Sequence, residues 1–323
     1  MSIYDKASLV LIPSGTKTSK VYSQKPVSGD GDFTFSRSTA ATRVNADGNI
    51  EKETQNLLLQ SNSFNTTWSN VNTTETSGQS GYDGSSDAWR INLNSGTATK
   101  LITQSVTALS GVYTASFYAK AGTHSIVQIG TSTQSNIFVS FDLSDGSVGS
   151  LSANAISAKA TDVGSSWYRI EVAFLSSNAN GISIAAVDSL SATRFQSTSS
   201  TGNFYIQDAQ LEQGLVARDY IETTTTAVEG GITDNVPRLD YTDSSCPALL
   251  LEPQRTNVFA QSEYLGAWTI TALSSRAISS TSSPEGYNNA YELIEDNTNS
   301  YHRIYENFSY TSGSTYSFSV FAK

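Results

Sequence analysis

Apolar and polar residues alternate over short stretches of this chain, which is the pattern of half-buried β-strands. Turn residues separate these stretches, and no long apolar stripe of helical period is present. Strands of this kind, at this spacing, predict an antiparallel sandwich of two sheets. In FDLSDGSVGS, an Asp-Gly turn between two strands also predicts a hairpin. The predicted strands of the sandwich are AWRINL, KLITQSV, YTASFYAK, SIVQIG, IFVSFDL, WYRIEVAF, ISIAAV and NFYIQDAQLE.

The chain also repeats itself. NLLLQSNSFNTTW at 56–68 returns as NVFAQSEYLGAW at 257–268, and the lead-in IEKETQN at 50–56 returns as LEPQRTN at 251–257. GVYTASFYAK, which ends at Lys120, returns as STYSFSVFAK, which ends at Lys323. Repetition of one module is typical of modular arrays rather than of single-site enzymes. The second copy reaches Lys323 in mid-module, where the first copy still has about 100 residues to run, so we expect at least roughly 100 further residues in the native protein.

These patterns predict four segments. Residues 1–49 form a β-rich N-terminal anchor, too poor in apolar residues to be stable alone. Residues 50–223 form the first β-sandwich module, and residues 224–256 form a linker and the repeated lead-in, with TTTTAVEGG as a polar hinge. Residues 257–323 form the first part of a second β-sandwich module. A half sandwich exposes an apolar sheet face, so either further chain or another subunit is expected to cover it.

The composition of the chain argues against two classes of partner, nucleic acids and membranes. Charged residues make up 15% of the chain, the net charge is −10, and no Lys/Arg cluster is present. A duplex-binding surface needs such clusters to displace counterions, so we expect no nucleic-acid partner. The longest early apolar run, Leu9 to Ile12, is too short for a signal peptide or a membrane span. The sequence therefore predicts a protein made in a cytoplasm and without a membrane partner.

Aromatic side chains are the main binding candidates, because a flat ring suits the apolar face of a pyranose. Large aromatic residues also dominate sandwich cores, and this interpretation is favoured for Trp68, Trp167 and Trp268. Two tyrosines follow Gly in loops, at equivalent places of the two copies. The predicted glycan-binding residues are Tyr82, Trp89 and Tyr287.

Metal and cofactor chemistry has little support. Asp83, Ser85 and Asp87 alternate along a loop, as Ca²⁺ ligands can, but no Glu completes a calcium-binding loop. An ordinary solvated turn is the favoured interpretation, and neither a metal site nor a cofactor is predicted. Cys246 is the only cysteine, which excludes an intrachain disulfide. A lone cysteine of this kind predicts a buried structural thiol.

Catalytic signatures are also sparse. The two histidines, His124 and His302, lie near no nucleophile motif, and no G-x-S-x-G elbow occurs. Glycoside hydrolysis needs two carboxylates that face each other across a sugar. The sequence cannot show that any two of its carboxylates converge, so we predict that the protein is not an enzyme. The carboxylate candidates are Glu51, Glu53, Asp142 and Glu171.

Two parts of the chain resemble a known family. SLVLIPSGTKTSKVYSQKP, followed by GDFTFSRSTAATRVNADGNIE, resembles a lead-in of structural proteins of tailed bacteriophages. NVPRLDYTDSSCPALLLEPQRTN resembles another element of those proteins. SSWYRIEVAF and FYIQDAQLEQGLVARDYIETT look like the closing strands of jelly-roll modules related to carbohydrate-binding and concanavalin-like domains.

The resemblance implies a virion protein. A head fibre or capsid-decorating fibre is the leading expectation, with residues 1–49 docked on capsid or tail proteins and the protein assembled as a homotrimer. The alternatives are a tail fibre or adhesin that binds host-surface or mucosal glycans and, third, a polysaccharide depolymerase. Each implies localisation in the virion after synthesis in the host cytoplasm, and release by lysis would need no secretion signal.

Overall fold

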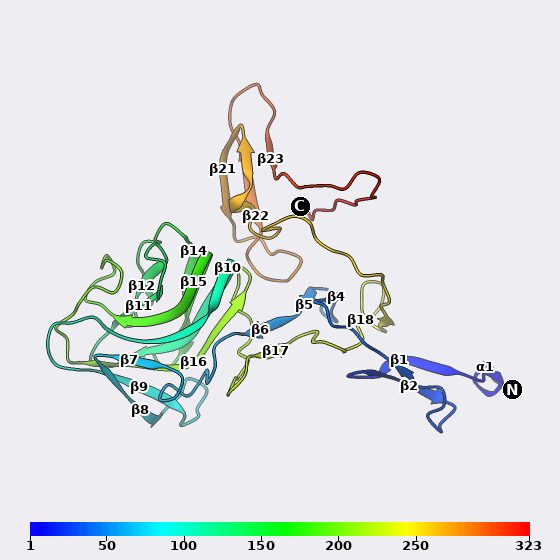
Figure 1. Ribbon diagram of the computed structural model, residues 1–323, viewed down its shortest axis with the longest axis horizontal. Coiled ribbons are helices and arrows are strands. Elements are labelled where there is room, and N and C mark those ends of the chain that lie inside the picture. Colours follow the sequence, from blue (N-terminus) through cyan, green and yellow to red (C-terminus); the bar gives the residue numbers. More distant parts are fainter. The chain divides into compact units, whose positions relative to one another are not determined.

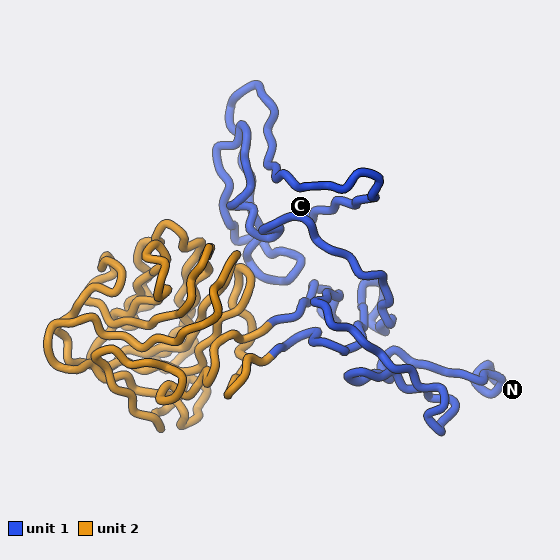
Figure 2. Tube along the Cα trace, in the orientation of Figure 1, with its two compact units in different colours: residues 1–54, 229–323 blue, residues 55–228 orange.

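The computed structural model describes residues 1–323 and is all-β, as predicted, apart from the short helix α1 (Ile3–Lys6) and the 3₁₀ turn η1 (Leu265–Ala267). The chain divides into two compact units (Figure 2), of which unit 1 comprises residues Met1–Thr54 and Glu229–Lys323 and unit 2 comprises Gln55–Val228. The predicted anchor and second module therefore belong to the same unit. No helix is long or apolar enough to cross a membrane.

Unit 2 is built on one ten-stranded antiparallel sheet, ordered β13-β12-β11-β15-β10-β16-β9-β8, with β14 paired to β15 and β7 paired to β10 (Figure 1). Strands β6 (Thr54–Asn56) and β17 (Val228–Gly230) lie where the chain passes between the units. The strands of the sheet are β7 (Ser69–Val71), β8 (Thr73–Gln79), β9 (Ala88–Leu93), β10 (Lys100–Ala121), β11 (Ile126–Thr131), β12 (Phe138–Asp142), β13 (Ser147–Val148), β14 (Ala155–Gly164), β15 (Trp167–Ala186) and β16 (Asn203–Gln213).

The two long strands curl this sheet into a sandwich-like fold. The first part of β10, residues 100–105, pairs with β7 and with the end of β15, whereas residues 111–121 pair with the start of β15 and with β16. Register shifts on either side of Leu109 separate the two parts. Irregularities of this kind bend strands, so β10 and β15 each contribute to both layers.

The core lies between the layers and follows the alternation of the strands. Ala115, Phe117 and Ala119 are buried in one apolar cluster with side chains of β9, β11, β12 and β16. Residues between them, such as Ser116 and Tyr118, face the other side of the sheet. Trp68 and Trp167 are buried, as the core interpretation predicts, whereas Trp268 is half-buried.

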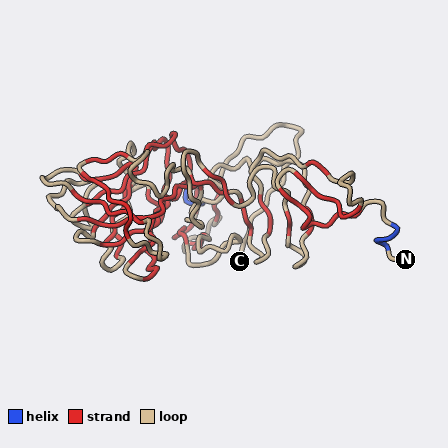
Figure 3. Tube along the Cα trace, turned by 90° about the horizontal axis from the view of Figure 1, so that it is seen from below, coloured by secondary structure: helices blue, strands red, loops and turns tan.

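Unit 1 consists of small antiparallel sheets joined by longer loops (Figure 3). The N-terminal sheet has three strands, and four two-stranded pairings follow. The strands are β1 (Val10–Lys17), β2 (Lys20–Lys25) and β3 (Phe33–Thr34), then β4 (Thr42–Val44) with β5 (Ile50–Lys52), β18 (Leu239–Asp240) with β19 (Ala248–Leu249), β20 (Thr269–Thr271) with β23 (Arg303–Tyr305), and β21 (Leu273–Ile278) with β22 (Tyr291–Glu295).

The sequence repeat is also a structural repeat. The indole N–H of Trp68 donates to the carbonyl of Gln60 at 3.3 Å, and Trp268 donates to Gln261 at 3.2 Å. Both glutamines have left-handed backbones, with φ of 49° and 52°. The strands that follow pair in the same way in both copies. β7 pairs with β10 in the first copy, and β20 pairs with β23 in the second. β8 pairs with β9 in the first copy, and β21 pairs with β22 in the second.

The lead-in before each module repeats as well. Each forms a hairpin closed by an Arg–Glu contact, which joins Arg43 to Glu51 at 2.8 Å and Arg238 to Glu252 at 3.0 Å. Cys246 lies in the longer turn of the second hairpin and is exposed, so the prediction of a buried thiol is wrong. The apolar run after Cys246 suggested burial, but the turn between β18 and β19 keeps the thiol in solvent.

Candidate functional site

The polar face of unit 2 lies on the outside of the layer that contains β14, the start of β15, the end of β10 and β16. Residues directly opposite each other in antiparallel strands point to the same face. The register therefore brings polar side chains of four strands into adjacent rows. One row is Lys159, Glu171, Ser116 and Gln210, and the next is Thr161, Arg169, Tyr118 and Gln207.

An aromatic pair adjoins this face. The ring of Tyr82, from the loop between β8 and β9, stacks on the ring of Tyr118 with centroids 3.6 Å apart and planes 7° apart. The hydroxyl of Tyr82 donates to Oδ2 of Asp208 at 3.0 Å, and Trp167 meets the ring edge-on. Burial, aided by the nearby Asp208 carboxylate, raises the pKa of the Tyr82 phenol. Tyr82 is therefore held as a neutral, oriented ring.

Asp208 is an unusual carboxyl group within a strand. It lies where β16 bulges against β10, has a φ of 54°, and is 8% exposed. Burial raises its pKa to about 7, and the Asp87, Asp83 and Glu222 carboxylates act in the same direction, against the hydrogen bond from Tyr82. The carboxyl is therefore half-protonated near neutral pH.

This carboxyl predicts a pH-dependent stability. Its folded pKa of about 7 lies above its ordinary value of 3.8, so the contribution of the protonated form is full below about pH 4 and is lost as the pH rises through 7. We expect the free energy of unfolding to fall by ~2 kcal/mol across this window, after allowance for solvent screening. Asp208→Asn should abolish this dependence of the free energy of unfolding on pH. Asp162→Asn, at an exposed carboxylate, should retain it. Urea unfolding at pH 5 and pH 8 measures the difference, and equal slopes in wild type and Asp208→Asn would contradict the prediction.

The loop that carries Tyr82 is fixed to the sheet by one glutamine. The Nε2 group of Gln207 donates to Asp83 Oδ1 and Ser85 Oγ at 3.3 Å and to Asp87 Oδ1 at 2.9 Å. Its Oε1 accepts from the backbone N–H of Tyr82 at 3.2 Å. The three loop oxygens considered as calcium ligands thus converge on an amide. No group of three or more His, Cys, Asp or Glu side chains in the structure could hold a metal ion.

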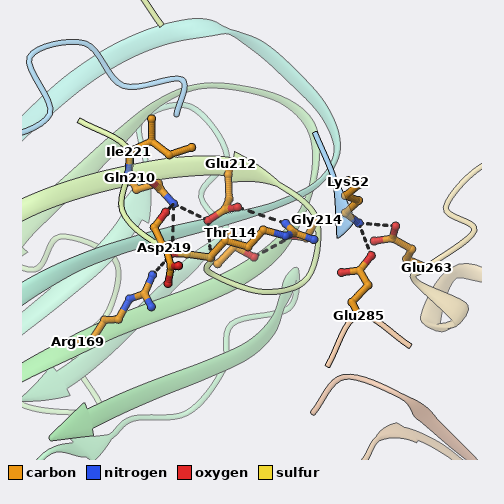
Figure 4. A network of polar contacts seen from close by, with 11 residues as sticks. Lys52, Thr114, Arg169, Gln210, Glu212, Gly214, Asp219, Ile221, Glu263 and Glu285 are labelled. Carbon is orange, nitrogen blue, oxygen red and sulfur yellow. Dashed lines mark hydrogen bonds and ion pairs between the residues drawn. The ribbon is translucent and has the colours of Figure 1, made fainter. Parts of the chain in front are cut away.

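A buried ionic network closes the other end of the face (Figure 4). The carboxylate of Glu212 accepts from Gln210 Nε2 at 2.7 Å and from Arg218 through its backbone N–H at 2.8 Å and its Nη1 at 3.2 Å. Arg169 Nη2 donates to the carbonyl of Arg218, and the Ile221 N–H donates to Gln210 Oε1 at 2.8 Å. These bonds pin the segment after β16 onto the sheet.

Figure 4 also shows a separate network in unit 1. There, Nζ of Lys52 lies 2.5 Å from Glu263 and 2.8 Å from Glu285. Because Glu263 and Glu285 belong to the second module and Lys52 to the first lead-in, this network joins two parts of unit 1.

The three predicted glycan-binding residues lie in different environments. Tyr82 has the stacked partner described above. Trp89 is 8% exposed, and its indole N–H donates to the Asn62 carbonyl at 2.9 Å, so its ring lies in the core beside Phe64. Tyr287 is half-buried in a turn of unit 1, where its carbonyl accepts from the Ser283 N–H. Sequence reasoning did not identify Tyr118, Asp208 or Arg169, although strand alternation places Tyr118 and Arg169 on one face.

The catalytic candidates are dispersed. In unit 1, Glu51 pairs with Arg43. Burial raises the pKa of the Glu53 carboxyl, which lies in the same unit. In unit 2, Asp142 accepts from the Ser144 N–H at 2.9 Å, and Glu171 lies on the polar face. These four carboxylates therefore have different surroundings.

The histidines are held by local partners. The ring of His124 contacts Ser200 Oγ at 3.1 Å through Nδ1 and the Ile126 carbonyl at 2.9 Å through Nε2. Ser200 Oγ also accepts from the Gly202 N–H at 3.2 Å. The ring nitrogens of His302 contact the backbone carbonyls of Ala272 and Thr298.

No protein-family model matches the chain, and no curated protein matches it. The distantly similar solved structures include the following two. The first is the carbohydrate-binding module TmCBM61 in complex with β-1,4-galactotriose, with 12% identity and a TM-score of 0.29 over 49% of this chain and 99% of that chain. The second is the enzymatically active domain of bacteriophage CBA120 tailspike protein 4, with 15% identity and a TM-score of 0.29 over 48% of this chain and 21% of that chain. Neither likeness carries an argument about function.

Proposed function

We propose that the protein is a structural protein of a bacteriophage virion, a head fibre or capsid-decorating fibre that displays β-sandwich modules. The observation that supports this best is the repeat of an Arg–Glu hairpin followed by a module with the same turn geometry, the same Trp-to-carbonyl bond and the same first strand pairings. Tandem modules of this kind suit extended assemblies that present surfaces at intervals. The resemblance of the lead-in segments to phage structural proteins supplies the virion context.

The N-terminal segment is the proposed docking element. Leu11 and Phe33 of its three-stranded sheet, and Leu9 just before β1, are exposed at 38%, 50% and 43%. Exposed apolar groups on one small sheet are typical of surfaces that bind a partner. Capsid or tail proteins are the proposed partners, and the homotrimer that the resemblance implies is part of the same proposal.

Deletion of residues 1–49 tests the docking role. Phage complemented with the shortened protein should yield particles that lack it by mass spectrometry and by microscopy, while phage complemented with the full chain should carry it. The shortened protein must remain folded, which circular dichroism of the purified chain checks. Particles that still carry the shortened protein at the normal amount would contradict the docking assignment.

A second candidate function is glycan binding by unit 2, favoured by the stacked and oriented ring of Tyr82. We expect Tyr82→Ala to reduce binding on an array of printed glycans, because one aromatic contact contributes about 1 kcal/mol or more. Tyr301→Ala, at an exposed tyrosine of unit 1, serves as the matched control and should leave binding unchanged. An array without any bound glycan would remove this candidate and leave the structural role unaffected.

A further inference from the structure

The second copy of the module contains a segment that has the sequence of a strand but no strand partner. STYSFSVFAK at 314–323 is the counterpart of GVYTASFYAK at 111–120, which belongs to the second half of β10. Residues 315–323, in the red segment of Figure 1, form no strand and no backbone–backbone hydrogen bond. Unpaired N–H and C=O groups along an apolar segment are a template for pairing with another strand.

The first copy shows how this sequence is covered when it is paired. Residues 113–120 of β10 lie directly opposite residues 167–174 of β15, in consecutive antiparallel pairs without a register shift. Every second side chain of this part of β10 points into the core. Phe117 is 2% exposed there and belongs to the same apolar cluster as Ile170 and Val172 of the partner strand.

The same positions of the second copy face solvent. Phe318 and Val320, at the counterparts of buried positions of β10, are 68% and 69% exposed. Phe318 meets Phe259 with ring centroids 5.8 Å apart, but most of its surface remains uncovered. Ser319 lies between the two apolar residues, so in an extended backbone both point to one face. An exposed apolar row of this kind is typical of a surface that binds a partner.

We propose that residues 315–323 accept, as an antiparallel neighbour, a strand of a partner chain that resembles the first half of β15. The occupant is an extended segment with apolar residues at every second position and polar residues between them. Main-chain hydrogen bonds hold this strand, and its apolar side chains cover Phe318 and Val320. In the register of the first copy, counterparts of Val172 and Ile170 lie opposite these two residues.

The pattern of the segment favours a strand over other kinds of partner. Tyr316, Phe318 and Val320 recur at every second position, which is the period of a strand and not of a helix. Residues 314–322 carry no charged side chain, so the segment offers no counter-charge to a nucleic acid or another polyanion. The proposal follows from the repeat, and it depends neither on a place in the virion nor on glycan binding.

The experiment uses the full chain and a synthetic peptide with the sequence of residues 165–176, SSWYRIEVAFLS. Calorimetry measures binding, and hydrogen exchange measures the protection of the amides of 315–323. We expect Val320→Ser to weaken binding about tenfold or more, because one apolar side chain is no longer buried by the peptide. Ser319→Ala, on the opposite face of the segment, should bind as wild type does. Thermal unfolding of both variants checks that the fold is kept.

A second peptide of the same length separates strand pairing from unspecific adhesion. It carries Ile170→Ser and Val172→Ser, and it should neither bind nor protect the amides of 315–323. Equal binding of the two peptides, no binding of either, or binding that Val320→Ser leaves unchanged would overturn the proposal. Protection of the same amides without any peptide, rising with protein concentration, would also overturn it, because the occupant would then be a second copy of this chain.

Discussion

Replacement of Glu212 by alanine is expected to lower the free energy of unfolding of unit 2 by about 3–5 kcal/mol, the usual cost of removing one partner from a buried ion pair. The Glu212 side chain is 1% exposed and accepts three hydrogen bonds from Gln210 and Arg218. Without it, the Arg218 guanidinium loses its 3.2 Å contact with the Glu212 carboxylate. The amide of Gln210 loses its shortest acceptor at the same time.

Urea unfolding followed by far-ultraviolet circular dichroism measures this effect. Gln213→Ala, at the exposed next position of the same strand, is the matched control and should stay within about 0.5 kcal/mol of wild type. Because Glu212 also pins the segment after β16, hydrogen exchange of the Ile221 amide should accelerate in Glu212→Ala and not in the control. A stability loss below about 1 kcal/mol would show that the pair behaves as a surface salt bridge.

The strand pattern predicted most of the sheet but not its continuity. KLITQSV and YTASFYAK were predicted as two strands, because Gly111 and the polar residues between them resemble a turn. In the structure they are one strand, β10, with irregular register around Leu109. The partner β15 is almost as long, so both strands can bend together and keep their hydrogen bonds. A local pattern of apolar and polar residues cannot distinguish one long, bent strand from two strands joined by a turn.

Among the strands of the large sheet that were not predicted, two are long. β8 (TTETSGQ) and β14 (AISAKATDVG) carry small or polar side chains and little apolar alternation. Each lies at an edge of the sheet or beside the main strand path, where one neighbour suffices and burial is partial. Edge strands of this kind form because a longer strand offers them hydrogen bonds, which their own sequence does not reveal.

The site was predictable in part. Alternation in AWRINL places Trp89 on the same face as Ile91 and Leu93, and both of these are buried, so this pattern indicates a core tryptophan. The sequence predicted that Tyr82 lies in a loop after Gly, and the structure places it in the loop between β8 and β9. Its contact with Asp208 spans 126 residues and depends on a loop meeting a bulged strand, and no local pattern encodes such a contact.

Replacement of Trp68 by alanine is expected to lower the stability of unit 2 by about 3–5 kcal/mol, the range for deletion of a large buried aromatic side chain. Trp68 is 6% exposed, packs against Phe64 with ring centroids 5.0 Å apart, and donates to the Gln60 carbonyl. Its loss leaves a cavity in the core and removes one of the two donors to the Gln60 carbonyl, which still accepts from the Ser63 N–H at 2.9 Å.

The repeat supplies the matched control for this prediction. Trp268 makes the same carbonyl bond and stacks on Phe259 at 5.2 Å, but it is only half-buried. The stability lost when an aromatic side chain is deleted follows the area that it removes from water. Trp268→Ala should therefore lower the free energy of unfolding roughly half as much as Trp68→Ala does, and the loss should fall on unit 1. Calorimetry of the full chain should show which thermal transition each change shifts. Equal losses in one shared transition would contradict the separate stability of the two units and the difference in burial between the two copies.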